Sequence, residues 1–342
     1  MKLSSNLQEV FPTKQAAWIF AIYITLFVNQ GWLVTASQES NNHYNYDIAL
    51  AVLLTEFLKL ICSFGLYSYQ YSLFNLVMEF KGNMKVFALY FVPASLYAVY
   101  NNLTYMNLST FDPTTYFVAL QMRVVLTGIV FQLIFNKKLS FKQWLSLVVL
   151  TVGCMVKQID FGDMPDKTDL KIGEKELSIS YSLGSLLLIA QILCSCLAGV
   201  YNEYLLKMHA EEVNVYIQNA YHYINSIICL VVIFTWQGKF THLFFSQTYK
   251  QFLDFKVAFV IINNVAIGIV TSFFLKYLNS ILKTFAGALE LVFTAVIARI
   301  LFGIPIYLNT LASIGLIVVA TIVYSQNPVT KPTKAKGELP YV

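Results

Sequence analysis

The feature that most constrains the fold of this chain is a series of apolar stretches, each close to the length of about 20 residues that a helix needs to cross a bilayer. Hydrophobic residues make up 57% of the 342 residues and charged residues 12%, about half the charged share of a soluble domain. We therefore predict an all-α, multi-pass protein of the lipid bilayer with ten transmembrane helices. The predicted spans are 15–36, 47–68, 85–107, 112–135, 142–159, 181–206, 213–236, 256–277, 282–302 and 306–325.

The connections between spans are too short to hold another folded domain. We expect a single ten-helix domain over 15–325, preceded by a polar segment 1–14 and followed by a basic tail 326–342. Lysines are concentrated in the loops that would share a side with the N-terminus, which predicts that both termini are cytosolic. The net charge of +5 is spread over these short loops, so we expect no nucleic-acid partner.

The two halves of the chain resemble each other weakly. Segments that begin at Asn101 and at Asn263 each contain an Asn-Asn pair, two spans, a short loop with a phenylalanine, and a last span. Five spans in each half, an odd number, would invert the second half relative to the first. We predict an inverted 5+5 repeat with halves 15–159 and 181–325, an arrangement typical of secondary transporters. The alternative is that two membrane segments look alike through composition alone.

Two charged residues, Glu56 and Lys59, lie in the middle of the second span. A charge at the centre of a transmembrane helix costs about 2.5–3.5 kcal/mol on insertion scales. Residues three apart share a helix face and can pair. Such a pair must face a neighbouring helix or a water-filled cavity, so it is either a structural ion pair or a contact for substrate.

Arg123 lies near the centre of the fourth span, and its planar guanidinium suits phosphate oxygens. The structural alternative is an ion pair with Glu290 at the repeat-related position. Lys276 and Lys283 flank a turn and could form a basic mouth, although the ordinary lysine bias of cytosolic loops explains them equally well.

Tyrosine and asparagine side chains at helical spacing form a second candidate group. Tyr97 and Asn101 share a stripe of the third span, with Asn102 beside them, and Asn219 and Tyr223 form a similar pair in the seventh. Such faces suit stacking a base and hydrogen-bonding its edge. Hydrogen bonding between helices would satisfy the asparagines equally well. A lone histidine such as His222 is more often structural than functional.

The deep cations, amides and tyrosines together outline a cavity for an anionic solute that carries an aromatic ring. No stretch combines a nucleophile with a base, metal ligands at suitable spacing, or a glycine-rich phosphate loop. We therefore expect no catalytic residues, no metal site, no cofactor and no enzyme activity.

Over most of its length the chain resembles the nucleotide-sugar transporters of the drug/metabolite transporter superfamily. It is most similar to the branch that carries CMP-sialic acid, UDP-galactose and UDP-N-acetylglucosamine. The matching stretches keep their order from about residue 15 to 325: TEFLKL, VPASLYAVYNNL, FDPTTYFVALQMRVVLTGIVF, LSFKQWLSLVVLTVG, GVYNEYLLK and FFLKYLNSILKTFAGALELVFTAVIARILFG.

The resemblance implies a transporter of the Golgi apparatus membrane that exchanges a cytosolic nucleotide sugar for a luminal nucleoside monophosphate by alternating access. UDP-galactose with UMP is the first choice. The alternatives are UDP-N-acetylglucosamine, CMP-sialic acid, or a non-transporting Golgi scaffold for glycosyltransferases. Possible protein partners are glycosyltransferases or a second copy of the chain.

The resemblance also implies substrate-binding roles for individual residues. The family's sugar-facing pair falls on Glu56 and Lys59, and its phosphate-facing cation falls on Arg123, where lysine is usual. Two further differences are Leu120 in place of a tyrosine and Asn279 in place of an aspartate. The remaining family positions fall on Tyr97, Asn101, Asn102, Tyr116, Asn219 and Lys276.

Overall fold

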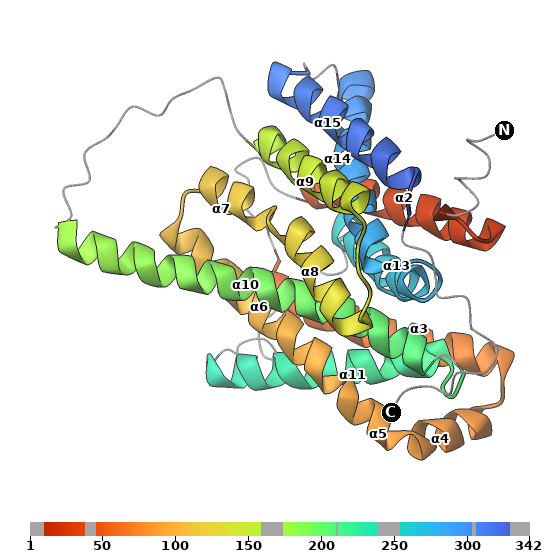
Figure 1. The fold of residues 1–342 in the computed structure, drawn as a ribbon. Helices are drawn as coiled ribbons and strands as arrows, with labels where there is room; N and C mark the ends of the chain where they lie inside the picture. The colour runs from red at the N-terminus through yellow and green to blue at the C-terminus, as the bar shows by residue number, and fades with distance from the viewer. Residues whose placement is uncertain are drawn as a thin grey trace.

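The computed structural model describes residues 10–37, 46–158, 174–209, 211–238, 254–302 and 306–328. Across these ranges the chain forms helices joined by turns, with no strand, which confirms the predicted all-α class for this part of the chain (Figure 1). Most of the predicted terminal segments, residues 1–9 and 329–342, lie outside these ranges.

The helices are α2 (Lys14–Ala36), α3 (Ile48–Gln70), α4 (Leu73–Gly82), α5 (Met84–Leu89), α6 (Phe91–Thr110), α7 (Pro113–Leu120), α8 (Arg123–Phe135), α9 (Phe141–Gln158), α10 (Glu174–Met208), α11 (Val215–Trp236), α13 (Phe255–Tyr277), α14 (Ser280–Phe302) and α15 (Leu308–Ser325).

Nine helical segments within the described ranges are long and apolar enough to cross a bilayer, so this is a multi-pass membrane protein. The predicted span at 142–159 folds as α9, a helix of 18 residues, but it is not among the nine. Lysine and glutamine side chains at its two ends lower its hydropathy: Lys142, Gln143, Lys157 and Gln158. The tenth span therefore remains a prediction.

The fourth predicted span is not continuous: it folds as α7 and α8, joined by a turn at Gln121 and Met122. The side-chain amide of Gln121 donates to the carbonyl of Phe117 at 3.3 Å. In an unbroken helix that carbonyl would accept the backbone N–H of Gln121, which donates instead to the carbonyl of Val118. The tightened turn makes Arg123 the first residue of α8.

The third predicted span is also divided, into α5 and α6, with Tyr90 between them. Pro93 lies in the first turn of α6 and has no N–H to donate to the carbonyl of Leu89. The chain can therefore change direction at Tyr90 at little additional cost in hydrogen bonds.

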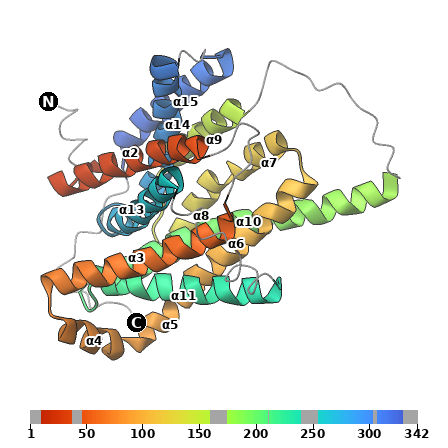
Figure 2. The same ribbon diagram turned by 180° about the vertical axis from the view of Figure 1, so that it is seen from behind.

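The helices pack in pairs that come from distant parts of the chain. In both ribbon views α9 lies along α15, α3 along α11, and α6 across α10 (Figures 1 and 2). The backbones of α9 and α15 approach closely at Gly153, where a Cβ atom would lie 3.0 Å from Cβ of Leu316. The hydroxyl of Ser313 donates to the carbonyl of Gly153 at 2.7 Å across the same contact.

Hydrogen bonds from side chains, to another side chain or to the backbone, fix α11 against the α4–α6 segment. The Tyr90 hydroxyl donates to Oε1 of Gln218 at 2.8 Å, and Nδ2 of Asn225 donates to the carbonyl of Phe87 at 3.0 Å. The hydroxyl of Tyr221 donates to the carbonyl of Phe80 at 2.8 Å. These bonds determine which face of α11 is turned toward α6, and the candidate site lies at that face.

Candidate functional site

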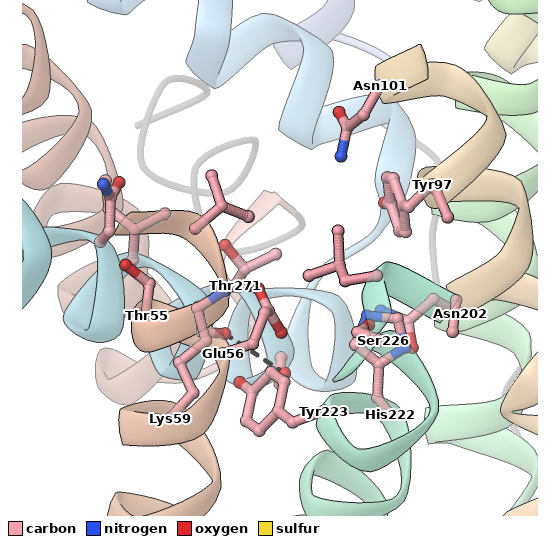
Figure 3. A pocket seen from close by; sticks show the side chains of 18 residues that line it. Thr55, Glu56, Lys59, Tyr97, Asn101, Asn202, His222, Tyr223, Ser226 and Thr271 are labelled. Atoms are coloured by element: carbon pink, nitrogen blue, oxygen red, sulfur yellow. Dashed lines mark hydrogen bonds and ion pairs between the residues drawn. The ribbon is translucent and has the colours of Figure 1, made fainter. Parts of the chain in front are cut away.

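Helices α3, α6, α10, α11 and α13 enclose a cavity of about 360 Å³ inside the bundle (Figure 3). Hydroxyl, amide and charged side chains form much of its wall, which is unusual for the interior of a membrane protein. The polar lining residues are Thr55, Glu56, Lys59, Tyr97, Asn101, Asn202, His222, Tyr223, Ser226, Asn264, Thr271 and Ser272.

The charged pair of the second span lies in the wall of this cavity. Nζ of Lys59 donates to Oε1 of Glu56 at 2.6 Å, and each side chain is 15% exposed. The ammonium group also lies 5.4 Å from the ring centre of Tyr223, within the range of a cation–π contact. The pair thus avoids lipid by facing a polar cavity, one of the two arrangements that its position in the sequence allowed.

Gly268 of α13 provides the space for the Lys59 side chain. A Cβ atom at this position would lie 2.6 Å from Cε and 2.7 Å from Cδ of Lys59. Such distances are too short for any real contact, so a larger residue would force the Lys59 side chain to move.

Tyr97 and Asn101 of α6 line the part of the cavity opposite α3 (Figure 3). Glu56, Lys59 and Tyr223 line the same cavity. The structure thus brings together five of the ten predicted binding residues. The i, i+4 spacing predicted that Tyr97 and Asn101 share a helix face, and the lining of the cavity agrees with it.

Asn102 and Tyr116 lie outside this cavity and bond to other helices. Oδ1 of Asn102 accepts from Nε2 of Gln237 at 3.0 Å. The Tyr116 hydroxyl accepts from Nε2 of Gln191 at 2.8 Å, and Tyr116 is buried. For Asn102 this is the interhelical alternative considered from the sequence.

Asn219 and Lys276 also lie outside the cavity lining. Asn219 is buried one turn before Tyr223, and its Nδ2 has no hydrogen-bond partner in the described part of the chain. Lys276 is partly buried in the last turn of α13.

Arg123 lies at the start of α8, outside the cavity. No ion pair within 4.0 Å joins it to Glu290 or to another carboxylate of the described ranges. Its charge interacts electrostatically with the hydroxyl of Tyr100, with Glu290 and with Lys283. Arg123 therefore lies within electrostatic range of Lys283, which the sequence had offered, together with Lys276, as a possible basic mouth.

Several lining residues were missed or discounted from the sequence. His222 had been treated as structural, while Asn202, Ser226 and Thr271 had not been singled out, yet all four line the cavity. His222 and Ser226 are four residues apart, so a search for polar residues at helical spacing around Tyr223 would have found them.

A second Glu–Lys pair, Glu203 and Lys207 of α10, was also missed. Glu203 is fully buried, and its Oε2 accepts the backbone N–H of Ser280 at 2.7 Å. Nζ of Lys207 donates to the other carboxylate oxygen and to the carbonyl of Leu278. This pair joins α10 to the turn between α13 and α14.

The chemistry available in the cavity is hydrogen bonding and charge pairing. Within the described ranges no group of three or more His, Cys, Asp or Glu side chains could hold a metal ion. A polar cavity enclosed by membrane-spanning helices is the kind of site that membrane transport proteins use for small solutes.

A family model described as "Nucleotide-sugar transporter" matches residues 18–325 of the chain. This protein therefore belongs to the nucleotide-sugar transporter family, whose members are transporters and not enzymes.

Among individual relatives, the UDP-galactose transporter senju of Drosophila melanogaster is 48% identical, with 98% of this chain and 92% of senju aligned. CMP-sialic acid transporter 1 of Oryza sativa subsp. japonica is 30% identical over 90% of this chain and 92% of its own length. CMP-sialic acid transporter 1 of Arabidopsis thaliana is 26% identical over 92% and 91% of the two chains. The resemblance stated from the sequence is confirmed.

One solved crystal structure superposes with a TM-score of 0.61 over 90% of this chain and 96% of its own, at 12% identity. At this identity the likeness concerns the fold alone.

The structure also gives Asn279 a local role. Oδ1 of Asn279 accepts the backbone N–H of Leu282 at 2.7 Å, at the start of α14. Asparagine and aspartate are equally good at such a helix cap. Asparagine therefore caps α14 at the position where the resemblance implies an aspartate.

Proposed function

We propose that this protein transports UDP-galactose across the Golgi membrane in exchange for UMP. The observation that carries the proposal is the 48% identity to a UDP-galactose transporter over almost the whole chain. The polar cavity inside the bundle gives the solute a place to bind. On this proposal the protein spans the bilayer ten times, with both termini cytosolic.

The contacts between helices support an inverted repeat, which alternating access requires in many transporters. Suppose that α2 to α9 supply the first five spans and α10 to α15 the second five. If the halves are repeats, a contact between two helices should have a counterpart between the two helices that lie five spans away from them in the order of the chain. The matched pairs are α6–α10 with α13–α2, α6–α11 with α13–α3, α8–α10 with α14–α2, and α8–α9 with α14–α15. Four of the five helices around the cavity, α3, α6, α11 and α13, exchange with one another under the same operation.

We place the sugar against Glu56, Lys59 and Asn101, because hydroxyl groups can both donate to a carboxylate and accept from an ammonium group. We place the phosphates toward Arg123, whose charge is not used in an ion pair within the described ranges. Tyr97 of α6 lines the cavity, and Tyr100, less than one turn later, interacts with Arg123. The two regions therefore lie on adjacent faces of α6, with Tyr97 on the side where we place the sugar.

Asn102, Tyr116, Asn219 and Lys276 remain proposed contacts only for other conformations of the transport cycle. In the conformation described here they lie outside the cavity lining. The substrate must bind both the cytosol-facing and the lumen-facing state, so a different set of side chains can reach it in each.

The test is exchange by purified protein in liposomes loaded with UMP, with radiolabelled UDP-galactose, UDP-N-acetylglucosamine or CMP-sialic acid outside. We expect uptake of UDP-galactose that depends on internal UMP and is abolished by Arg123→Ala in a folded protein. Preferred uptake of CMP-sialic acid would favour the activity named for the 30% identical relative. No uptake by correctly folded protein would contradict the transport proposal and favour a Golgi scaffold.

A further inference from the structure

His222 of α11 lies in the wall of the cavity (Figure 3). Its imidazole is partly exposed, whereas its Nδ1 atom is buried and has no hydrogen-bond partner within the described ranges. Polar atoms at the depth of a membrane span are normally satisfied, because neither lipid nor bulk water can replace a missing partner. The described protein groups therefore leave hydrogen-bonding capacity of His222 unused, and a ligand in the cavity can reach the imidazole through the exposed part of its ring.

Three aromatic rings hold the imidazole in position. The ring centres of Tyr90, Tyr97 and Tyr223 lie 6.1, 6.0 and 5.9 Å from that of His222, each in an edge-on arrangement. Tyr90 is itself fixed by its bond to Gln218 on α11. The surroundings thus orient the imidazole without supplying a partner for Nδ1.

Two of the three charged groups that act on His222 are already paired with each other. Glu56 and Lys59 interact electrostatically with His222, but the two form their own ion pair at 2.6 Å. Lys283 acts on His222 through the same kind of longer-range interaction. The wall around the imidazole is therefore close to neutral and rich in hydroxyl and amide groups, including Asn101, Asn202 and Thr271.

A wall of this kind suits a neutral ligand with several hydroxyl groups better than it suits a diphosphate, because Lys59, the cation among the lining residues, is already paired with Glu56. A neutral imidazole carries one donor and one acceptor, so a single ring can serve a hydroxyl group in either role. By contrast, an ammonium group only donates and a carboxylate only accepts.

We propose that His222 is a specificity-determining residue that hydrogen-bonds a hydroxyl group of the hexose in the transported nucleotide sugar. The inference rests on the proposed function, because it assigns the sugar portion of the substrate to this end of the cavity. It predicts that His222 affects the affinity for a nucleotide sugar without affecting the affinity for the nucleoside monophosphate.

The experiment compares the wild type with His222→Phe, His222→Gln and His209→Gln in liposome exchange. Phenylalanine keeps a flat ring but removes both nitrogens, whereas glutamine keeps one donor and one acceptor. His209 serves as the matched control, because its Nδ1 lies 3.0 Å from the exposed Glu212 and it does not line the cavity. The KM for UDP-galactose, for its epimer UDP-glucose and for UMP is measured in each, and folding is checked by thermal unfolding in detergent.

We expect His222→Phe to raise the KM for UDP-galactose by about tenfold or more, the usual effect of one lost hydrogen bond to a buried group. Discrimination between the two epimers should weaken, UMP exchange should remain within about twofold, and His222→Gln should restore part of the affinity. If His222→Phe does not fold, the epimer ratio of His222→Gln decides, because an amide cannot reproduce the geometry of the imidazole.

An unchanged epimer ratio and unchanged KM for UDP-galactose would overturn the inference while leaving the proposed function intact. An equal loss for UMP and UDP-galactose would also overturn it, because His222 would then support the nucleotide or the fold. Failure of the wild type to take up any nucleotide sugar would instead contradict the proposed function itself, and the inference with it.

Discussion

Two Glu–Lys pairs lie inside this helical bundle, and their surroundings differ. The pair Glu56–Lys59 lies in the wall of a cavity, with 15% of each side chain exposed. In the pair Glu203–Lys207 the carboxylate is fully buried, and both partners also bond to the backbone of the turn between α13 and α14.

The difference shows how the same two residue types can serve opposite purposes. The backbone bonds of Glu203 and Lys207 fix α10 to α13 and α14 and leave little capacity for a ligand. Glu56 and Lys59 bond to each other and face space that a solute can enter. We therefore expect substitutions at Glu203–Lys207 to affect stability and substitutions at Glu56–Lys59 to affect transport.

The largest effect should come from Glu203→Gln. Removing one partner of a buried ion pair leaves an uncompensated charge, and typically costs about 3–5 kcal/mol of the free energy of unfolding. Thermal unfolding of the detergent-purified protein measures the loss, with Glu212→Gln, an exposed carboxylate on the following turn, as control. An unfolding temperature equal to that of the wild type would show that this pair does not hold the bundle together.

Glu56→Gln should have the opposite effect, a loss of transport with little loss of stability. The cavity leaves this pair partly solvated, so we expect a change of less than about 1 kcal/mol in the free energy of unfolding. Uptake of UDP-galactose should nevertheless fall at least about tenfold, because the proposed hydrogen bond from a sugar hydroxyl to the charged Glu56 carboxylate is lost. Liposome exchange and thermal unfolding of the same preparation test both parts, and a loss of stability without a transport defect would assign the pair a structural role.

Gly268→Ala should reproduce a weaker form of this transport defect without altering either charge. The added methyl group would occupy the space of Cδ and Cε of Lys59 and so move its ammonium group away from Glu56. Gly287→Ala on α14 is the control, because a Cβ atom there would meet nothing within 4 Å. Equal transport by the two variants would mean that the position of Lys59 matters less than its charge.

The smallest effect should come from Asp112, an exposed carboxylate that, like Glu203, accepts a backbone N–H. Oδ2 accepts from Thr115 at 2.8 Å, and this bond to the first turn of α7 holds the pKa of Asp112 below its ordinary value. The lowered pKa stabilises the protein at pH values above the unfolded-state pKa, and the stabilisation is lost as the pH falls through the folded-state pKa.

Asparagine also caps helices well, so Asp112→Asn should cost only a few tenths of a kcal/mol at neutral pH. The difference in unfolding temperature between wild type and variant should shrink as the pH is lowered into the acidic range. A loss as large as that of Glu203→Gln would show that the backbone bond, and not burial, sets the cost of losing either carboxylate.

The helical class and nine of the ten predicted spans could be obtained from the sequence, because hydropathy is summed locally along the chain. The breaks in two spans could not. The break before Arg123 depends on the rotamer of Gln121, whose side chain takes the carbonyl that a continuous helix would use. Composition does not determine such a choice.

The site was predicted in part. Spacing placed Glu56 with Lys59 and Tyr97 with Asn101 on shared helix faces, and both pairs line the cavity. Spacing could not tell that Tyr116 would bond Gln191, or that His222 would be left without a partner for Nδ1. These outcomes depend on which neighbouring helix each face meets.

The sequence by itself therefore determined that the chain is an all-α membrane protein of the nucleotide-sugar transporter family, and which polar residues lie deep in its spans. Only the tertiary structure decided which of those residues share a cavity and which join helices to each other. The reason is physical. The depth of a residue in the membrane follows from the local run of apolar residues, whereas the face that a helix turns toward its neighbours is set by packing against helices distant in the chain.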